Sequence, residues 1–174
     1  MIRLLGIKIV DRIKEAGLTQ GILSKHASVI TTRLGFHEVT DTLCSREAYI
    51  ILHLKDDHAE AEMLINELKP LGGVLIREIV FGNMRKEPAV EINQGTTEIL
   101  ALLVQRKHDV VTRVQDILTA YGCNIRTRLG VNETFFGEPS GLIILELTGD
   151  HHQRELLEKD LNRVEGVHTG KMVF

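Results

Sequence analysis

The chain has 174 residues, of which 43% are hydrophobic and 26% charged, and its formal net charge is −3. That charge lacks the basic field of nucleic-acid-binding modules, and no apolar run reaches the ~20 residues that span a bilayer. Two cysteines exclude a disulfide framework and the first residues do not form a signal peptide, so we expect a cytoplasmic protein.

The first half of the chain alternates short apolar runs with segments of helical spacing. The predicted elements are, in chain order, a strand at Leu4–Val10, a helix ending near His26, strands at Val29–Thr40 and Ala48–Leu54, a helix from Asp57 and a strand at Val74–Phe81. Asp57 and Glu60 have the spacing of a capping box. The first helix is the weakest of these elements, because Gly17 and Gly21 each cost about 1 kcal/mol relative to alanine.

The second half of the chain follows after Gly82–Gly95, which has no sustained apolar period and is predicted to be a linker. The elements predicted beyond it are a strand at Glu98–Val104, a helix at Asp109–Tyr121, strands at Asn124–Val131 and Leu142–Leu147, a helix capped by Asp150 and a strand at Val167–Phe174. Gln153 stands three residues after Asp150, again as in a capping box. The two halves therefore have the same element order.

The two halves are copies of one another in sequence as well. Thr19–Glu38 and Val114–Glu133 agree at nine of twenty positions, including an unbroken Thr-Arg-Leu-Gly. Ile50–Phe81 and Ile143–Phe174 agree at thirteen of thirty-two positions, whereas chance would give roughly one in sixteen. The offset between the copies falls from 95 to 93, so the second copy lacks two residues, a change that loops absorb most easily.

Each copy has the β-α-β-β-α-β order of the ferredoxin-like motif. The fold class predicted is α+β, with two tandem ferredoxin-like, ACT-like domains at residues 1–81 and 96–174 joined by a linker at 82–95. Each domain should have a four-stranded antiparallel sheet, with its first and third strands central and both helices on one face. The central runs Ile99–Val104 and Leu142–Leu147 are apolar on both alternations. We therefore expect the helix-free face to be covered by the sister copy or a second chain.

No catalytic constellation is recognisable in the sequence. It contains no phosphate loop, no Gly-x-Ser-x-Gly, no Cys-x-x-Cys and no His-Glu-x-x-His. Paired acids such as Asp56 and Asp57 stand at a helix start, where capping explains them. We therefore expect a protein that is not an enzyme, and no cofactor is indicated.

A metal site is an alternative interpretation. His37 on the second predicted strand, Cys44 in the following loop and His53 on the third strand could meet across a β-hairpin. Mixed His and Cys sets suit nickel, zinc or iron. The second copy has Asn132 and Glu146 in place of the two histidines, so two polar strand residues and a loop thiol are the simpler explanation of the pattern.

The repeated Thr-Arg-Leu-Gly suggests a different kind of site. On a strand, Leu34 and Leu129 should face the core and Arg33 and Arg128 the opposite side. Each arginine is followed five residues later by an acid, Glu38 or Glu133. One interpretation is an edge strand protected by charge. The other is an anion clamp at the interface between the copies, built from these four charged residues, because arginine forks bind carboxylates and phosphates.

A family resemblance adds to these patterns. Gln115–Asp150, reading QDILTAYGCNIRTRLGVNETFFGEPSGLIILELTGD, together with the ending GVHTGKMVF, resembles the iron-only hydrogenase system regulators. The match covers the second copy, about half of the chain, and the first copy is a more divergent version. That family is similar in fold to ACT domains and to the metal-sensing domain of nickel-responsive repressors. The resemblance implies a regulatory role linked to FeFe-hydrogenase maturation or anaerobic metabolism.

Two departures from the related families stand out. ACT domains have Pro-Gly at the turn into the first helix, where this chain has Ile13-Lys14 and, in the second copy, His108-Asp109. Nickel repressors place histidines on the second strand, where this chain has Arg128 and Gly130. Their DNA-binding segment is missing as well, so a role in transcription would need a partner protein.

These observations together predict a ligand-responsive regulatory or sensor protein. It would bind a small molecule or metabolite effector at the interface between ACT-like repeats or subunits and signal through a protein partner. A homo-oligomer is expected, without direct nucleic-acid binding and without a membrane. The alternatives are a transition-metal sensor that uses the His and Cys residues of the first copy, and a structural assembly module without a ligand.

Overall fold

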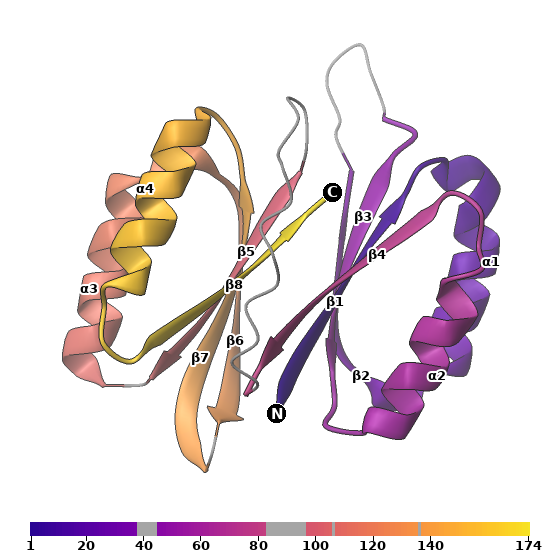
Figure 1. The fold of residues 1–174 in the computed structure, drawn as a ribbon, viewed down its shortest axis with the longest axis horizontal. Coiled ribbons are helices and arrows are strands. Elements are labelled where there is room, and N and C mark those ends of the chain that lie inside the picture. Colours follow the sequence, from indigo (N-terminus) through magenta and orange to yellow (C-terminus); the bar gives the residue numbers. More distant parts are fainter. Residues whose placement is uncertain (38–44, 83–96, 106, 136) are drawn as a thin grey trace. The chain divides into compact units, whose positions relative to one another are not determined.

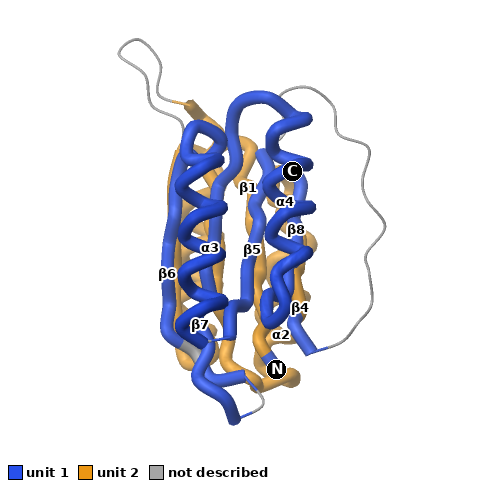
Figure 2. The backbone as a smooth tube through the Cα atoms, turned by 90° about the vertical axis from the view of Figure 1, so that its left-hand side faces the viewer, with its two compact units in different colours: residues 1, 81–174 blue, residues 2–80 orange. Residues whose placement is uncertain are grey.

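A computed structural model describes residues 1–37, 45–82, 97–105, 107–135 and 137–174 (Figure 1). The chain forms two compact units, one at Ile2–Val80 and the other at Phe81–Phe174 with Met1 (Figure 2). Each unit holds one copy of the sequence duplication, called here the N-terminal and the C-terminal repeat. Among the described residues, no helix is long and apolar enough to span a membrane.

Both repeats have the predicted element order. The N-terminal repeat consists of β1 (Ile2–Ile9), α1 (Arg12–Lys25), a 3-10 turn (Ala27–Val29), β2 (Ile30–Phe36), β3 (Ala48–Leu54), α2 (His58–Leu68) and β4 (Val74–Phe81). The C-terminal repeat consists of β5 (Glu98–Gln105), α3 (His108–Ala120), a 3-10 turn (Gly122–Asn124), β6 (Ile125–Phe135), β7 (Glu138–Leu147), α4 (His151–Asn162) and β8 (Val167–Val173). The elements of one repeat thus recur one for one in the other.

The strand order is β2-β3-β1-β4 in the first sheet and β6-β7-β5-β8 in the second. The first and third strands of each repeat are central, and the helices of each repeat lie over one face of its sheet (Figures 1 and 2). This topology confirms two tandem ferredoxin-like units of the α+β class. The predicted linker lies almost entirely outside the described residues.

Each repeat has its own core between its helices and its sheet. In the C-terminal repeat, Leu102 of β5 and Leu145 of β7 pack with Leu157 and Leu161 of α4, and each of these side chains is fully buried. Such a core supplies most of the stability of a small domain, because each fully buried leucine contributes about 1.5–3 kcal/mol relative to an exposed one. Aspartates cap the second helix of each repeat as predicted, with Glu60 N donating to Asp57 and Gln153 N to Asp150.

Two strands of the C-terminal repeat are longer than the sequence pattern predicted. The antiparallel pairing of β6 with β7 continues from Ile125 opposite Leu147 to Phe135 opposite Glu138. The apolar runs end earlier, and β7 contains Pro139 and Gly141, residue types that argue against a strand when it is predicted from propensity. Cross-strand hydrogen bonding near the turn, rather than burial, therefore defines this end of the hairpin.

Helix α1 contains the two glycines that weakened its prediction, and both are exposed. A Cβ atom added at Gly21 would meet no atom within 4 Å. Replacing Gly21 by alanine should therefore raise the free energy of unfolding by up to about 1 kcal/mol, because it removes backbone freedom from the unfolded chain without creating a clash. Urea unfolding followed by far-ultraviolet circular dichroism measures the change.

A contrasting substitution serves as the control for Gly21. Gly73 has a φ of 83°, in the left-handed region that side chains rarely adopt. Gly73→Ala should lower the unfolding midpoint. If Gly21→Ala and Gly73→Ala changed the free energy of unfolding in the same direction, the explanation would be contradicted.

An ion-pair cluster lies where β1, α2 and β4 meet. Arg3 Nη2 is 2.5 Å from Glu62 Oε1 and 2.7 Å from Glu78 Oε2, and the arginine side chain is only 10% exposed. The hydrogen bond from Arg3 lowers the pKa of Glu62 from its ordinary value of 4.5. The cluster therefore links the stability of the N-terminal repeat to pH.

The sign of this linkage gives a pH prediction. Because the pKa of Glu62 is lower in the folded than in the unfolded protein, its contribution to stability is present above pH 4.5 and is lost as the pH falls through the folded-state pKa. Arg3→Met should make the unfolding midpoint less steeply dependent on pH below 4.5. Lys14→Met, which removes an exposed cation of α1, is the control and should leave that slope unchanged.

Candidate functional site

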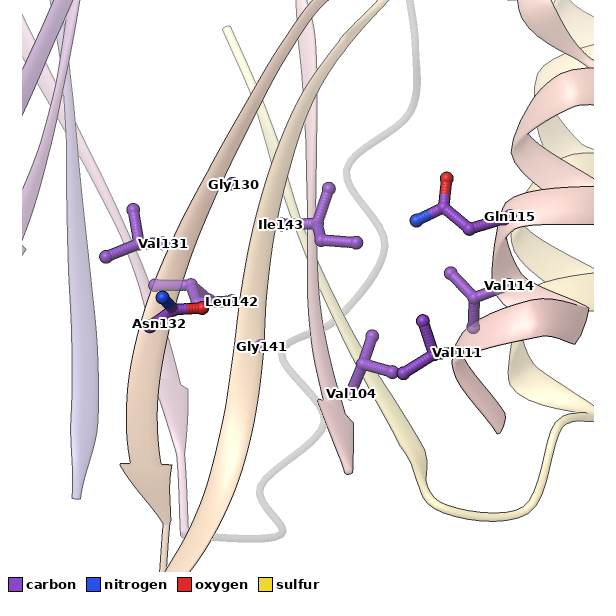
Figure 3. A pocket seen from close by; sticks show the side chains of 10 residues that line it. All are labelled: Val104, Val111, Val114, Gln115, Gly130, Val131, Asn132, Gly141, Leu142 and Ile143. Atoms are coloured by element: carbon purple, nitrogen blue, oxygen red, sulfur yellow. The ribbon is translucent and has the colours of Figure 1, made fainter. Parts of the chain in front are cut away.

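A cavity of about 300 Å³ lies in the C-terminal repeat between α3 and the sheet (Figure 3). Its lining is mostly aliphatic and includes two carboxamides. The residues that line it are Val104, Val111, Val114, Gln115, Gly130, Val131, Asn132, Gly141, Leu142 and Ile143. This volume is at the lower end of those found for ligand pockets in proteins.

The cavity exists because two strands carry glycine where a helix crosses them. Gly130 of β6 pairs with Ile143 of β7, and Gly141 of β7 pairs with Asn132 of β6. A Cβ atom at Gly130 would meet nothing within 4 Å, and one at Gly141 would meet only Val104 O at 4.0 Å. The space that two side chains would fill is therefore left open beneath α3.

The inner walls of this cavity, called the groove below, are apolar and buried. Val104 of β5 and Val114 of α3 are 3% and 1% exposed, and both belong to the core of the repeat. Val111, one turn before Val114 on α3, is 38% exposed and stands at the mouth. Because the core residues are held by packing on their other sides, the groove does not depend on a mobile segment for its shape.

One end of the groove is polar. Arg128 of β6 donates from Nη1 to Gln115 Oε1 of α3 over 3.0 Å. An arginine can only donate, so the amide oxygen of Gln115 must face it, and the amide nitrogen is directed elsewhere. Figure 3 shows this nitrogen pointing across the groove toward Ile143. A hydrogen-bond donor is thus presented to whatever occupies the groove.

The N-terminal repeat contains the same pair. Arg33 Nη1 donates to Gln20 Oε1 over 2.6 Å, and both residues are 95 positions before their counterparts. Around the pair the lining differs, because Ala48 replaces Gly141 and His37 replaces Asn132. The polar pair is therefore common to both repeats, whereas the surface beside it is not.

The orientation predicted for the arginines is wrong. Arg33 and Arg128 lie on the helix-bearing face of their strands, and Leu34 and Leu129 on the opposite face. The register explains the difference, because both β2 and β6 have a bulge just after their first residue, between Ile30 and Thr32 and between Ile125 and Thr127. One extra residue reverses the face of every side chain that follows.

The structure does not show whether the two acids of the predicted clamp lie beside these arginines. Glu38 lies outside the described residues, and Glu133 belongs to β6, where its backbone is opposite Ser140. The arginine–glutamate clamp between the copies therefore stays a prediction. What the structure adds is a different partner for each arginine, a glutamine of the preceding helix.

The two histidines of the alternative metal site lie at opposite ends of the hairpin. His53 of β3 is opposite Thr32, whereas His37 follows Phe36 at the other end of β2. Five residues separate Thr32 from His37, about 16 Å along a strand. Cys44 lies outside the described residues. In the described ranges, no three His, Cys, Asp or Glu side chains are grouped so that they could hold a metal ion.

The groove itself was missed by the sequence reasoning. Gln20 and Gln115 are identical between the aligned copies, and so are Gly35 and Gly130. That identity was a usable signal for the polar pair. Nothing in the sequence, however, indicated that Gly130 of β6 and Gly141 of β7 are diagonal neighbours under α3, because this depends on the register of the hairpin.

Comparisons with known proteins found distant structural similarity only. No protein-family model matches the chain, and no curated protein matches it. A solved structure of an uncharacterized protein from Thermotoga maritima is 22% identical, with a TM-score of 0.39, over 45% of this chain and 95% of that one. The acetolactate synthase small subunit from the same organism is 13% identical, with a TM-score of 0.36, over 100% and 96% of the two chains.

The regulatory subunit of aspartate kinase from Thermus thermophilus is a third similar structure. It is 11% identical, with a TM-score of 0.35, and the match covers 94% of this chain and 93% of that one. At this level of similarity, the assignment of the fold rests on the chain's own element order and strand topology, those of two tandem ferredoxin-like units.

Proposed function

We propose that the protein is a regulatory module, not an enzyme, that binds a small effector and signals through contacts with another protein. The observation that supports this function is the preformed groove under α3, with aliphatic walls and a single donor-rich end. Apolar cavities with a few convergent polar groups are the usual form of small-molecule sites. A cytoplasmic homo-oligomer fits this role.

The effector that we propose is anionic. Arg128 and Arg33 each use one guanidinium nitrogen to hold a glutamine, which leaves further N–H groups on the same fork. Arginine forks bind carboxylates and phosphates in pairs of hydrogen bonds. In this proposal the arginines contact the effector, and Glu38 and Glu133 of the predicted clamp do not, because a carboxylate repels an anion.

We propose that the protein regulates FeFe-hydrogenase maturation or a related part of anaerobic metabolism. Support comes from the sequence of the C-terminal repeat, whose Gln115–Asp150 segment resembles the iron-only hydrogenase system regulators. The polar pair and the groove lie within or next to this segment. Co-purification of a maturation protein in the presence of the effector would test the link.

A thermal-shift screen against organic acids, nucleotides and amino acids tests the function. A ligand at 100 times its Kd should stabilise the protein by about 2.7 kcal/mol. Arg128→Met should abolish the part of the shift that comes from the C-terminal repeat. Arg33→Met is the matched control and reports whether the N-terminal repeat binds too. If no compound stabilises the protein and a partner co-purifies without any ligand, the protein is an assembly module instead.

A further inference from the structure

The groove of the C-terminal repeat has a lining that specifies the chemical class of its ligand. Val104, Val111, Val114 and Ile143 present only branched aliphatic surface. Aromatic side chains are absent from the lining among the described residues, so a planar ring would have no stacking partner. The cavity of about 300 Å³ therefore fits a short, branched hydrocarbon chain.

The polar end of the groove specifies the head group. Gln115 presents its amide nitrogen to the groove because Arg128 occupies its oxygen at 3.0 Å. Arg128 does not itself line the cavity, but it holds Gln115, which does, and in the described part of the chain it forms no ion pair, so a ligand beside Gln115 could reach its second terminal nitrogen. The neutral amide of Gln115 and the cationic guanidinium of Arg128 together offer two donors, which match the two oxygens of a carboxylate.

The same end of the groove disfavours a positive charge. Its described lining residues include no Asp or Glu, and the one carboxamide oxygen at the arginine end is already taken. An ammonium group would therefore lose water next to a guanidinium without gaining a carboxylate partner, which is costly in a partly desolvated site. The amide of Asn132 at the rim is neutral and does not offset this.

We infer that this groove binds a small branched aliphatic monocarboxylate that lacks an ammonium group, such as 3-methylbutanoate, in preference to the corresponding amino acid. This inference rests on the proposed effector-binding function and specifies the ligand class for the same site. The hydrocarbon chain lies against the valines, and the carboxylate accepts hydrogen bonds from Gln115 and Arg128.

Isothermal titration of the full chain with four probes tests the inference. The probes are 3-methylbutanoate, valine, 3-methylbutanamide and 3-methylbutan-1-amine. We expect the carboxylate to bind at least about tenfold more tightly than each of the other three, a difference of 1.4 kcal/mol or more. Equal or tighter binding of valine or the amine would overturn the inference.

Two pairs of matched variants locate the site. Gln115→Glu keeps the shape and the contact with Arg128 but replaces the donor by a negative charge, so binding of 3-methylbutanoate should be lost. Gln20→Glu makes the same change at the aligned position of the N-terminal repeat and should leave binding unchanged. Gly130→Ala adds a methyl group into the groove and should weaken binding about tenfold or more, whereas Gly35→Ala should not.

The outcomes separate this inference from the proposed function. If none of the four probes binds but a nucleotide or another anion stabilises the protein through Arg128, the ligand class is wrong and the regulatory function stands. If 3-methylbutanoate binds and neither Gln115→Glu nor Gly130→Ala weakens it, the groove is not its site. If no compound of either panel binds, both proposals fail.

Discussion

Replacing Arg154 by alanine is expected to lower the free energy of unfolding of the C-terminal repeat by about 3–5 kcal/mol. Arg154 of α4 places Nη1 3.0 Å from Oε1 of Glu98 on β5, and the glutamate side chain is only 2% exposed. Removing the arginine leaves a carboxylate inside the protein with no cation to offset its lost hydration. That uncompensated charge, rather than the lost contact itself, makes the effect large.

Urea unfolding followed by far-ultraviolet circular dichroism measures this loss, since the chain has no tryptophan. Amide hydrogen exchange in β5 should speed up while exchange in β1 does not, which assigns the effect to one repeat. The control is the double variant Glu98→Leu with Arg154→Leu, which should be close to wild type because replacing both charges by apolar groups is often neutral. A double variant as unstable as Arg154→Ala would contradict the explanation.

Replacing His26 by alanine is expected to lower the free energy of unfolding of the N-terminal repeat by about 2–3 kcal/mol. The imidazole, at the end of α1, is 4% exposed, and its Nδ1 is 2.6 Å from Oε1 of Glu60 on α2. Its Nε2 is 3.3 Å from Oε1 of Glu67, seven residues or about two turns further along α2. The histidine thus joins the two helices, chiefly through its hydrogen bond with Glu60, and alanine would lose that bond.

The C-terminal repeat suggests the control for this variant. Its residue aligned with His26 is Tyr121, whose hydroxyl donates to Asp160 of α4 over 2.7 Å. Asp160 in turn aligns with Glu67. His26→Tyr should therefore keep more than half of the stability that His26→Ala loses, as measured by the urea midpoint. Equal losses for the two variants would mean that a tyrosine hydroxyl does not replace the imidazole contact with α2, which would contradict the expected rescue.

The duplication made the fold predictable from one sequence. Each copy supported the assignment of the other, so that even α1, with Gly17 and Gly21 inside it, could be assigned through the more regular α3. The helix starts at Asp57 and Asp150 were read correctly because capping is a local property of a few residues. Predictions that depended on local chemistry were therefore confirmed.

The predictions that failed concerned register. Strict alternation from Ile30 placed Leu34 toward the helices, but the bulge before Thr32 reverses this. A bulge requires no particular residue type and so cannot be recognised in this sequence. The faces on which Arg33 and Arg128 lie, and their glutamine partners, could therefore not be derived from it. The groove was hidden for the same reason, since only the register of β6 against β7 makes its two glycines diagonal neighbours.

The ion pairs that join the strands to the helices have opposite polarity in the two repeats. Arg3 meets Glu62 and Glu78 in the first, whereas Glu98 meets Arg154 in the second. Tandem copies of one sequence risk exchanging elements while they fold. If α2 settled on the sheet of the C-terminal repeat, Glu62 would lie beside Glu98. If α4 settled on the other sheet, Arg154 would lie beside Arg3. The charge reversal therefore penalises both misassembled forms and directs each helix to its own sheet.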